Sequence, residues 1–524
     1  MYASSFTLRC KSTPTGGDFK IKKEKCRSIR NISALLRLYF LHINYLCKVF
    51  IKLFFTVKNA RFNLSFLLKI SLVSAMGGLL FGYDYVVIGG AKPFYERFFD
   101  IASSAGLQAW AMSSALIGCI VGAIVSGFVS DKFGRKKSLL GSAFLFITAS
   151  LGTGMAGSFG MFACFRILGG MGIGLASALS PMYIAEITPA PLRGRFVSLN
   201  QMTIVIGILL AQIVNLMIAE KVPGEATDSF IAASWNGQMG WRWMFWACAI
   251  PSILFFLFTF FIPESPRWLL KAGKPEAAFP VLEKIGGNLY ARQETDNIKA
   301  SLNDTSDKTD FKALFNPVFA PILIIGIVLA VLQQWCGINV VFNYAEEIFS
   351  AAGYGVSDTL FNIVVTGSVN LIFTFVAMFT VDRLGRKKLM VFGAGGLTLN
   401  FLLLGSAFFF HLKGIAVLVL VVAAIAIYAM SLAPIVWVIL SEIFPNRIRS
   451  AAMASATFAL WVACFVLTYT FPLLNKSLGA AGTFWVYSAI CLSGFIFIAI
   501  KLPETKGKSL EEIENVLIKN GKSV

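Results

Sequence analysis

The stretch DKFGRKK at residues 131–137 returns as DRLGRKK at residues 382–388. A second pair recurs at nearly the same offset, with EITPAPLR at residues 186–193 and EIFPNRIR at residues 442–449. Repeated signatures in the same order and at a near-constant offset are the mark of an internal duplication. The sequence therefore predicts that the chain consists of two halves of the same architecture.

Long apolar runs make up most of the chain. It is 57% hydrophobic and 14% charged, whereas soluble domains carry about 25% charged residues. An apolar run of about 20 residues is long enough to cross a bilayer as a helix. We expect twelve such spans, near residues 64–88, 108–130, 138–157, 160–184, 196–219, 243–262, 319–348, 359–381, 389–410, 415–440, 451–474 and 482–502.

The repeats divide these spans six and six. A third, weaker echo supports this division, because PESPR at 263–267 and PETKG at 503–507 each follow the last span of a half. Two such halves are expected to be related by a pseudo-two-fold axis along the membrane normal. The sequence thus predicts an all-α membrane protein with twelve transmembrane helices in two pseudo-symmetric six-helix bundles.

The domain boundaries follow from where the polar segments lie. We expect the bundles at residues 61–262 and 319–502, a cytoplasmic helical linker at 263–318 and a cytoplasmic tail at 503–524. The extension at 1–60 is basic. It is interpreted as a disordered arm, as an amphipathic helix at the membrane surface, or as an artefact of a gene start placed too far upstream.

Lys and Arg concentrate in alternate short loops, those after spans 2, 4, 8 and 10. Cytoplasmic loops carry an excess of these residues. Both termini are therefore expected on the cytoplasmic side of the plasma membrane, which is the inner membrane of a bacterium. The loop residues are Lys132, Arg135, Lys136, Lys137, Arg193, Arg195, Arg383, Arg386, Lys387, Lys388, Arg447 and Arg449.

Nothing in the sequence indicates a metal centre, a cofactor or an enzyme. The nine cysteines are scattered without a CxxC pair, and there are only two histidines. No paired catalytic carboxylates, nucleophile triad or phosphate-binding loop is recognisable. The net charge of +19 is concentrated toward the N-terminus. Anionic lipid explains such an arm better than nucleic acid does, so no nucleic-acid partner is expected.

Span 7 carries amide side chains inside an apolar run. Gln333, Gln334 and Asn339 are costly there, because an unpaired amide loses on the order of 2–7 kcal/mol on leaving water. In a continuous helix the three do not share a face, whereas a local break at Gly337 would let them converge. Two interpretations are open: amides that hold helices together, or a binding site for a neutral polyol.

The repeated loops place opposite charges at matching positions. Arg135 and Arg386 can bind carboxylates, and Glu186 and Glu442 are candidate partners. We predict a cytoplasmic latch that holds the halves together in the outward-open state and parts in the inward-open state. The alternative is that these charges only set the topology. The whole set is Asp131, Arg135, Glu186, Arg193, Asp382, Arg386, Glu442 and Arg449.

Two ionisable residues of the first half fall inside spans: Asp84 in span 1 and Arg166 in span 4. Such residues are expected to be functional and to have a partner. We predict that Asp84 exchanges a proton when its distance to Arg166 changes between conformations. The alternative is a permanent structural ion pair.

Together these motifs resemble the sugar porter family of the major facilitator superfamily, and most of all its bacterial xylose–proton symporters. The resemblance covers about residues 64–510. The motifs that carry it are GYD at 82–84, DKFGR at 131–135, RILGG at 166–170, PMYIAE at 181–186, PESPR at 263–267, QQWCGIN at 333–339 and PETKG at 503–507.

The resemblance implies a set of sugar contacts. The amides would bind hydroxyl groups, and two indole rings would face the C–H surface of a pyranose. The implied residues are Gln201, Gln333, Gln334, Asn339, Asn370, Trp437 and Trp461. It also implies a monomer in membrane lipid that moves a monosaccharide together with protons. An uncoupled sugar uniporter and a sugar receptor that does not transport are the alternatives.

Three positions depart from the xylose-porter pattern. Ile208 stands where a second glutamine is usual, and Leu460 stands where an amide is usual. Asn343 replaces the tyrosine of the outer gate in span 7. We expect these changes to alter which sugar is bound rather than the class of protein.

Overall fold

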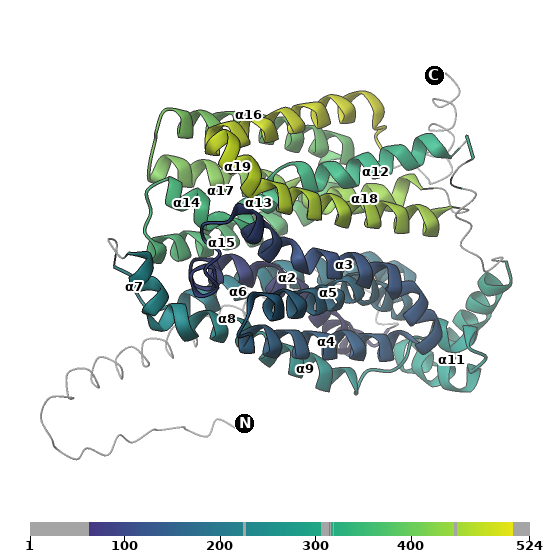
Figure 1. Ribbon diagram of the computed structural model, residues 1–524. Coiled ribbons are helices and arrows are strands. Elements are labelled where there is room, and N and C mark those ends of the chain that lie inside the picture. The colour runs from purple at the N-terminus through teal and green to yellow at the C-terminus, as the bar shows by residue number, and fades with distance from the viewer. Residues whose placement is uncertain are drawn as a thin grey trace, which may run out of the picture. The chain divides into compact units, whose positions relative to one another are not determined.

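The computed structural model describes residues 62–506, except 224–226, 305–313, 315, 318 and 445–447. The chain divides into two compact units, Met1–Arg61 and Phe62–Val524, and every described element belongs to the second. The expectations for residues 1–60 and for most of the tail at 503–524 lie outside the described residues. Within the described part all regular structure is helical (Figure 1), which confirms the predicted fold class.

The first half contains six membrane-spanning segments. Polar caps begin several of them: Asn63, Ser104 and Ser158 each accept a hydrogen bond from the backbone N–H three residues later. The last segment begins with a π-helical turn, η1. The elements are α2 (Leu64–Phe98), α3 (Ala105–Phe133), α4 (Arg135–Met155), α5 (Phe159–Ile187), α6 (Ala190–Ile218), α7 (Asp228–Ala233), η1 (Asn236–Gly240), α8 (Trp241–Ala247) and α9 (Ala249–Thr259).

Between the halves lie α10 (Pro266–Lys271) and α11 (Pro275–Asp304). α11 bends at Gly287, whose φ of 80° lies in the left-handed region. The second half follows with α12 (Ala320–Trp335), α13 (Ile338–Asn343), α14 (Ala345–Ala351), α15 (Val356–Leu384), α16 (Arg386–Phe409), α17 (Ile415–Met430), α18 (Leu432–Ile443) and α19 (Arg449–Lys501).

The number of spans agrees with the twelve expected. Among the described residues eleven helical segments are long and apolar enough to cross a membrane. The last of them, within α19, is interrupted at Gly479, whose φ of 68° and ψ of 174° are not helical. α19 therefore supplies two spans, one on each side of this glycine. In Figure 1 helices α2–α9 group together, as do helices α12–α19.

Glycines let the helices of the first half approach closely. A Cβ on Gly170 of α5 would collide with the carbonyl oxygen of Ala115 on α3, and one on Gly118 would collide with that of Ile167. Between α2 and α6 the same holds for Gly82. Small residues at such crossings are what drives helix association in lipid, where the hydrophobic effect between helices is absent.

We predict that Gly170→Val destabilises the first half. The added side chain meets backbone rather than a flexible side chain, so α3 and α5 must separate, at a cost of about 1–3 kcal/mol or more. Thermal unfolding of the purified protein measures the effect. Gly160→Val on the same helix is the control, because a Cβ there has no atom within 4 Å. Equal melting temperatures for the two variants would contradict the prediction.

Candidate functional site

Span 7 breaks where the sequence predicted. α12 ends at Trp335, and Gly337 takes a left-handed conformation with φ 85° before α13 begins. The break brings the three amides together. Asn339 Nδ2 donates to Gln334 Oε1, and Gln334 Nε2 donates to Gln333 Oε1 over 3.5 Å. The convergence that a continuous helix forbids is therefore present.

Gln333 also joins span 7 to span 10. Its Nε2 donates to the carbonyl oxygens of Leu432 and Ala433, at 3.2 and 3.0 Å. Span 10 is itself broken there, because Ser431 between α17 and α18 has φ −126° and ψ −87°. In this conformation Gln333 therefore acts as the helix-joining amide of the first interpretation. Asn339 is only half-buried.

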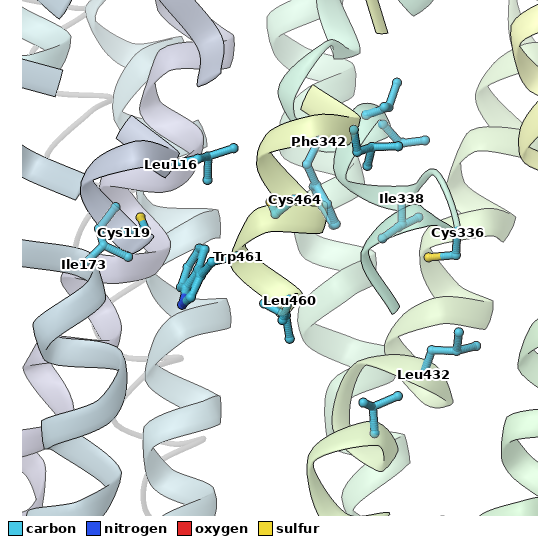
Figure 2. Packing of buried hydrophobic residues seen from close by; sticks show 14 of the residues in the cluster. Leu116, Cys119, Ile173, Cys336, Ile338, Phe342, Leu432, Leu460, Trp461 and Cys464 are labelled. Carbon is cyan, nitrogen blue, oxygen red and sulfur yellow. The ribbon is translucent and has the colours of Figure 1, made fainter. Parts of the chain in front are cut away.

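The remaining predicted sugar contacts are distributed over both halves. Asn370 is buried on α15, and Gln201 is half-buried on α6. Trp461 of α19 is 4% exposed and lies 5.7 Å from the Phe81 ring of α2. Figure 2 shows its indole reaching from α19 toward the helices of the first half. Trp437 of α18 is 37% exposed, so burial alone does not mark it as part of an enclosed wall.

The altered gate position makes a contact between the halves. Asn343 Nδ2 donates to Tyr85 Oη over 3.2 Å, and Tyr85 Oη lies 3.4 Å from Cys464 Sγ. Tyr85 belongs to α2, whereas Asn343 and Cys464 belong to α13 and α19. An amide here thus binds across the interface of the two halves.

Asp84 and Arg166 form a buried ion pair. Arg166 Nη1 donates to both carboxylate oxygens at 3.1 Å and to the Asp84 carbonyl oxygen at 3.3 Å. The two residues are 4% and 2% exposed. The guanidinium also lies over the Phe245 ring, 5.7 Å from its centroid. Charges at this depth require a partner, and each supplies the other's.

The first repeated loop forms an ion network within the first half. Arg135 donates through Nε and Nη2 to Glu186, at 2.9–3.2 Å, and through Nη1 to Asp131. Its backbone N–H donates to Glu264 Oε1 over 2.9 Å. Gly134, with φ 92°, makes the turn that begins α4.

The second loop repeats this geometry. Arg386 Nη2 donates to Glu442 Oε1 over 3.2 Å, and its backbone N–H donates to Glu504 Oε1 over 3.0 Å. Gly385 has the same φ of 92°. The three sequence repeats are thus one structural unit that occurs once in each half: a glycine turn, an arginine with a glutamate partner, and a second glutamate that binds the start of the next helix.

These described pairs join elements of the same half, whereas the latch prediction placed ion pairs between the halves. The difference has a physical reason, since the loop and its partner helix are neighbours within one bundle. Arg193 Nε donates to the Ala185 carbonyl oxygen, also within its half. The side chains of Asp382 and Arg449 lie outside those that the structure describes. A bridging role for the latch in the outward-open state stays a prediction.

Comparison with known proteins agrees with this geometry. The family described as "Sugar (and other) transporter" matches residues 70–517. The chain belongs to the sugar transporter family. It is 40% identical to the D-xylose-proton symporter of Escherichia coli K12 (87% of this chain, 96% of the relative) and 38% identical to the arabinose-proton symporter of Bacillus subtilis 168, with the same coverage.

A solved structure shares the fold. The partially occluded inward-open conformation of the xylose transporter XylE from E. coli superposes on this sugar transporter with a TM-score of 0.75. The two are 38% identical, and the match covers 85% of this chain and all of the other. The major facilitator architecture is therefore shown by sequence and structure together.

One cluster of charges in this transporter was not predicted from its sequence. Lys92 of α2 is 2% exposed and lies close to Glu96, Glu346 and Glu347. A signal was present, because Lys92 and Glu96 fall at i and i+4 at the end of an apolar run, and ionisable residues beside spans are functional candidates. Their partners could not be found in this way, because they lie in the other half of the chain.

We predict that Asn339→Ala weakens sugar binding about tenfold, since it removes one or two hydrogen bonds worth about 0.5–1.5 kcal/mol each. Gln333→Ala is expected to lower the melting temperature as well, because it also removes the two hydrogen bonds that tie span 7 to the carbonyls of Leu432 and Ala433 in span 10. Calorimetric binding and thermal unfolding measure the two effects. Unchanged affinity in folded Asn339→Ala would leave only the helix-joining interpretation.

We predict that Arg135→Ala destabilises the first half by about 1–3 kcal/mol, because it leaves the largely buried Glu186 without its ion-pair partner. Lys137→Ala removes an exposed positive charge from the same loop and serves as the control. Thermal unfolding in detergent compares them. If both variants melt at the temperature of the parent, the ion network of Arg135 does not contribute to the stability of the fold.

Proposed function

We propose that this membrane protein is a sugar–proton symporter that works by alternating access. The observation that carries the proposal is the buried Asp84–Arg166 pair in a chain whose span 7 gathers three amides at a helix break. The relatives named as proton symporters of xylose and arabinose support it. The substrate is a monosaccharide, held by amides from both halves.

Sugar binds between the halves, where Gln201 and Asn370 complement the span 7 amides. Carboxamides offer both donors and acceptors, which suits hydroxyl groups. Trp461 offers an apolar face near Phe81, which suits the C–H surface of a pyranose ring. The substitutions at Ile208, Leu460 and Asn343 make this surface less polar at one side and change its gate, so sugar preference is expected to differ from that of a xylose porter.

The loops at Arg135 and Arg386 are assigned to the cytoplasm, because they are rich in Lys and Arg. The opposite side, which holds the α2–α3 loop and α14, then faces outward. The contacts from Asn343 to Tyr85 and from Lys92 to Glu347 join the halves near that side. They support an inward-facing conformation. Both termini are placed in the cytoplasm, and the protein is assigned to the bacterial inner membrane as a monomer in lipid without nucleic acid.

Coupling is assigned to the Asp84–Arg166 pair. In this conformation the arginine neutralises the Asp84 carboxylate. When a conformational change separates the pair, a proton takes the place of the arginine as the partner of the carboxylate. Proton uptake and release are thereby linked to the states of the transport cycle.

Asp84→Asn tests this assignment, since it keeps the shape of the side chain and removes its titration. We expect loss of sugar accumulation driven by a pH gradient in proteoliposomes, with counterflow of labelled sugar kept within about twofold of the parent. Asp358→Asn, an exposed change, is the control. Should Asp84→Asn still concentrate sugar, the pair is structural. Should the parent show counterflow without accumulation, the protein is a uniporter. A parent without counterflow would be a receptor.

A further inference from the structure

Four charged side chains meet between the two halves, near the outward side. Lys92 Nζ lies 3.1 Å from Glu96 Oε1, 3.5 Å from Glu346 Oε2 and 2.6 Å from Glu347 Oε1. Lys92 and Glu96 belong to α2 of the first half, whereas the other two glutamates belong to α14 of the second. We call these four residues the Lys92 cluster.

The Lys92 cluster is unbalanced in charge. Three carboxylates share one ammonium group. The side chains of Lys92 and Glu96 are 2% and 6% exposed, and those of Glu346 and Glu347 are 17% and 22% exposed. Surplus negative charge in such a place is costly, and carboxylates that share a site are relieved when one of them takes a proton. Nearby cations do little to restore the balance: Arg97 pairs with Asp228, and Lys476 is exposed.

One carboxylate oxygen of the cluster has an unused hydrogen-bonding position. Glu347 Oε2 is buried, and among the described residues it has no partner in hydrogen-bonding geometry. Glu96 Oε1 also lacks a partner in that geometry, but it lies 3.1 Å from Lys92 Nζ. Glu96 Oε2, in contrast, accepts from Lys92 and from Gln108 Nε2. A buried carboxylate oxygen without a donor is where a proton can reside, since a carboxylic acid supplies its own O–H.

The other polar groups beside the cluster are neutral or engaged elsewhere. Tyr95 Oη donates to Met112 Sδ, and Tyr344 Oη donates to the Thr468 carbonyl oxygen. Glu347 lies beyond the membrane-spanning segment, which ends at Asn343. Burial raises the pKa of Glu347 to about 8, with Lys92 opposing the rise and the other two glutamates adding to it.

Solvent can reach the cluster from one side. A cavity of about 200 Å³ has Glu347 and Gln108 in its wall. Its other lining residues come from the α2–α3 loop, the start of α3 and the middle of α19: Ala102, Ser103, Ala105, Pro472, Asn475 and Lys476. These segments lie at the outward side as assigned above, so a proton can pass between that solution and Glu347 without crossing the membrane.

We propose that the Lys92 cluster is a second protonation site, which takes a proton from the outward side when that side closes and returns it to the same side when the halves part. The O–H bond forms on a glutamate of the cluster and breaks when Glu346 and Glu347 move away from Lys92 and Glu96. This proton is not carried across the membrane. It makes closure of the outward side depend on external pH, and the inference rests on the proposed alternating access.

The sign of the effect follows from linkage. A carboxylate with a raised pKa in the closed state binds more protons there than in the open state, so closure is favoured at low pH. That preference is lost as the pH rises through about 8. The acidic outer solution that drives symport would therefore also help to close the outer side behind a bound sugar.

Infrared difference spectroscopy of the purified full chain tests the site without any transport. We expect a protonated-carboxyl C=O band that grows as the pH is lowered from about 9 to about 6. Glu347→Gln should remove or shift this band, and Asp84→Asn should retain it. A parent without such a band overturns the proposal, and so does a band that survives in the variant with Glu96, Glu346 and Glu347 all changed to Gln.

Sugar counterflow in proteoliposomes, at equal pH on both sides, tests the consequence. We expect the parent to lose about threefold or more of its rate between about pH 7 and about pH 9, and Glu347→Gln to flatten this profile. The matched control is Asp358→Asn, which removes an exposed carboxylate near the start of α15, away from the Lys92 cluster, and should keep the parent profile. An unchanged profile in Glu347→Gln refutes the pH-dependent closure. A parent without counterflow at any pH refutes the proposed function instead, while the infrared result still stands.

Discussion

A polar side chain in hydrocarbon must find its hydrogen-bond partners within the protein, and the two broken helices of this transporter meet that demand together. Span 7 is interrupted at Gly337, and span 10 is interrupted at Ser431. Gln333 of the first donates to the carbonyls of Leu432 and Ala433 at the second. Irregular backbone at membrane depth is tolerated where it is buried in protein or lines a cavity. Here one amide ties its own broken span to the broken span beside it and also belongs to the candidate sugar site.

The charged side chains likewise find their partners within the protein. Within the first half Asp84 is held by Arg166, and at the repeated loops each arginine is held by a glutamate of its own half. These are pairs of one cation with a well-placed acceptor. The Lys92 cluster differs, because it combines groups from both halves and has more carboxylates than cations. The cluster has more negative than positive groups and is shared between two halves that move. Its binding of a proton is therefore suited to depend on whether the halves are in contact.

The pseudo-symmetry explains why loops and gate behave differently. The unit made of a glycine turn, an arginine and two glutamates recurs at Arg135 and at Arg386, and in both places it joins elements of one bundle. Functional residues break the symmetry. Asp84 and Arg166 lie in the first half, the converging amides lie in the second, and Asn343, Tyr85 and Cys464 connect them. Transport requires rigid halves with an adjustable interface, and the contacts divide in that way.

Much of this protein could be predicted from its sequence because the decisive signals are local. Apolar runs predicted the twelve spans, the repeated loops predicted two like halves, and Gly337 among amides predicted the break in span 7. The hydrogen bonds from Gln333 to span 10 and the 37% exposure of Trp437 could not be predicted. Glu186 was a candidate partner of Arg135, but the sequence did not indicate that this pair lies within one half. The partners of Lys92 could not be predicted either, since Glu346 and Glu347 lie far away along the chain.

Sequence by itself determined which segments are helices and which polar residues they carry, since length and hydropathy are properties of each segment. Only the tertiary structure decided which of those polar groups meet, because that depends on how separate helices pack and on which side of the interface is closed.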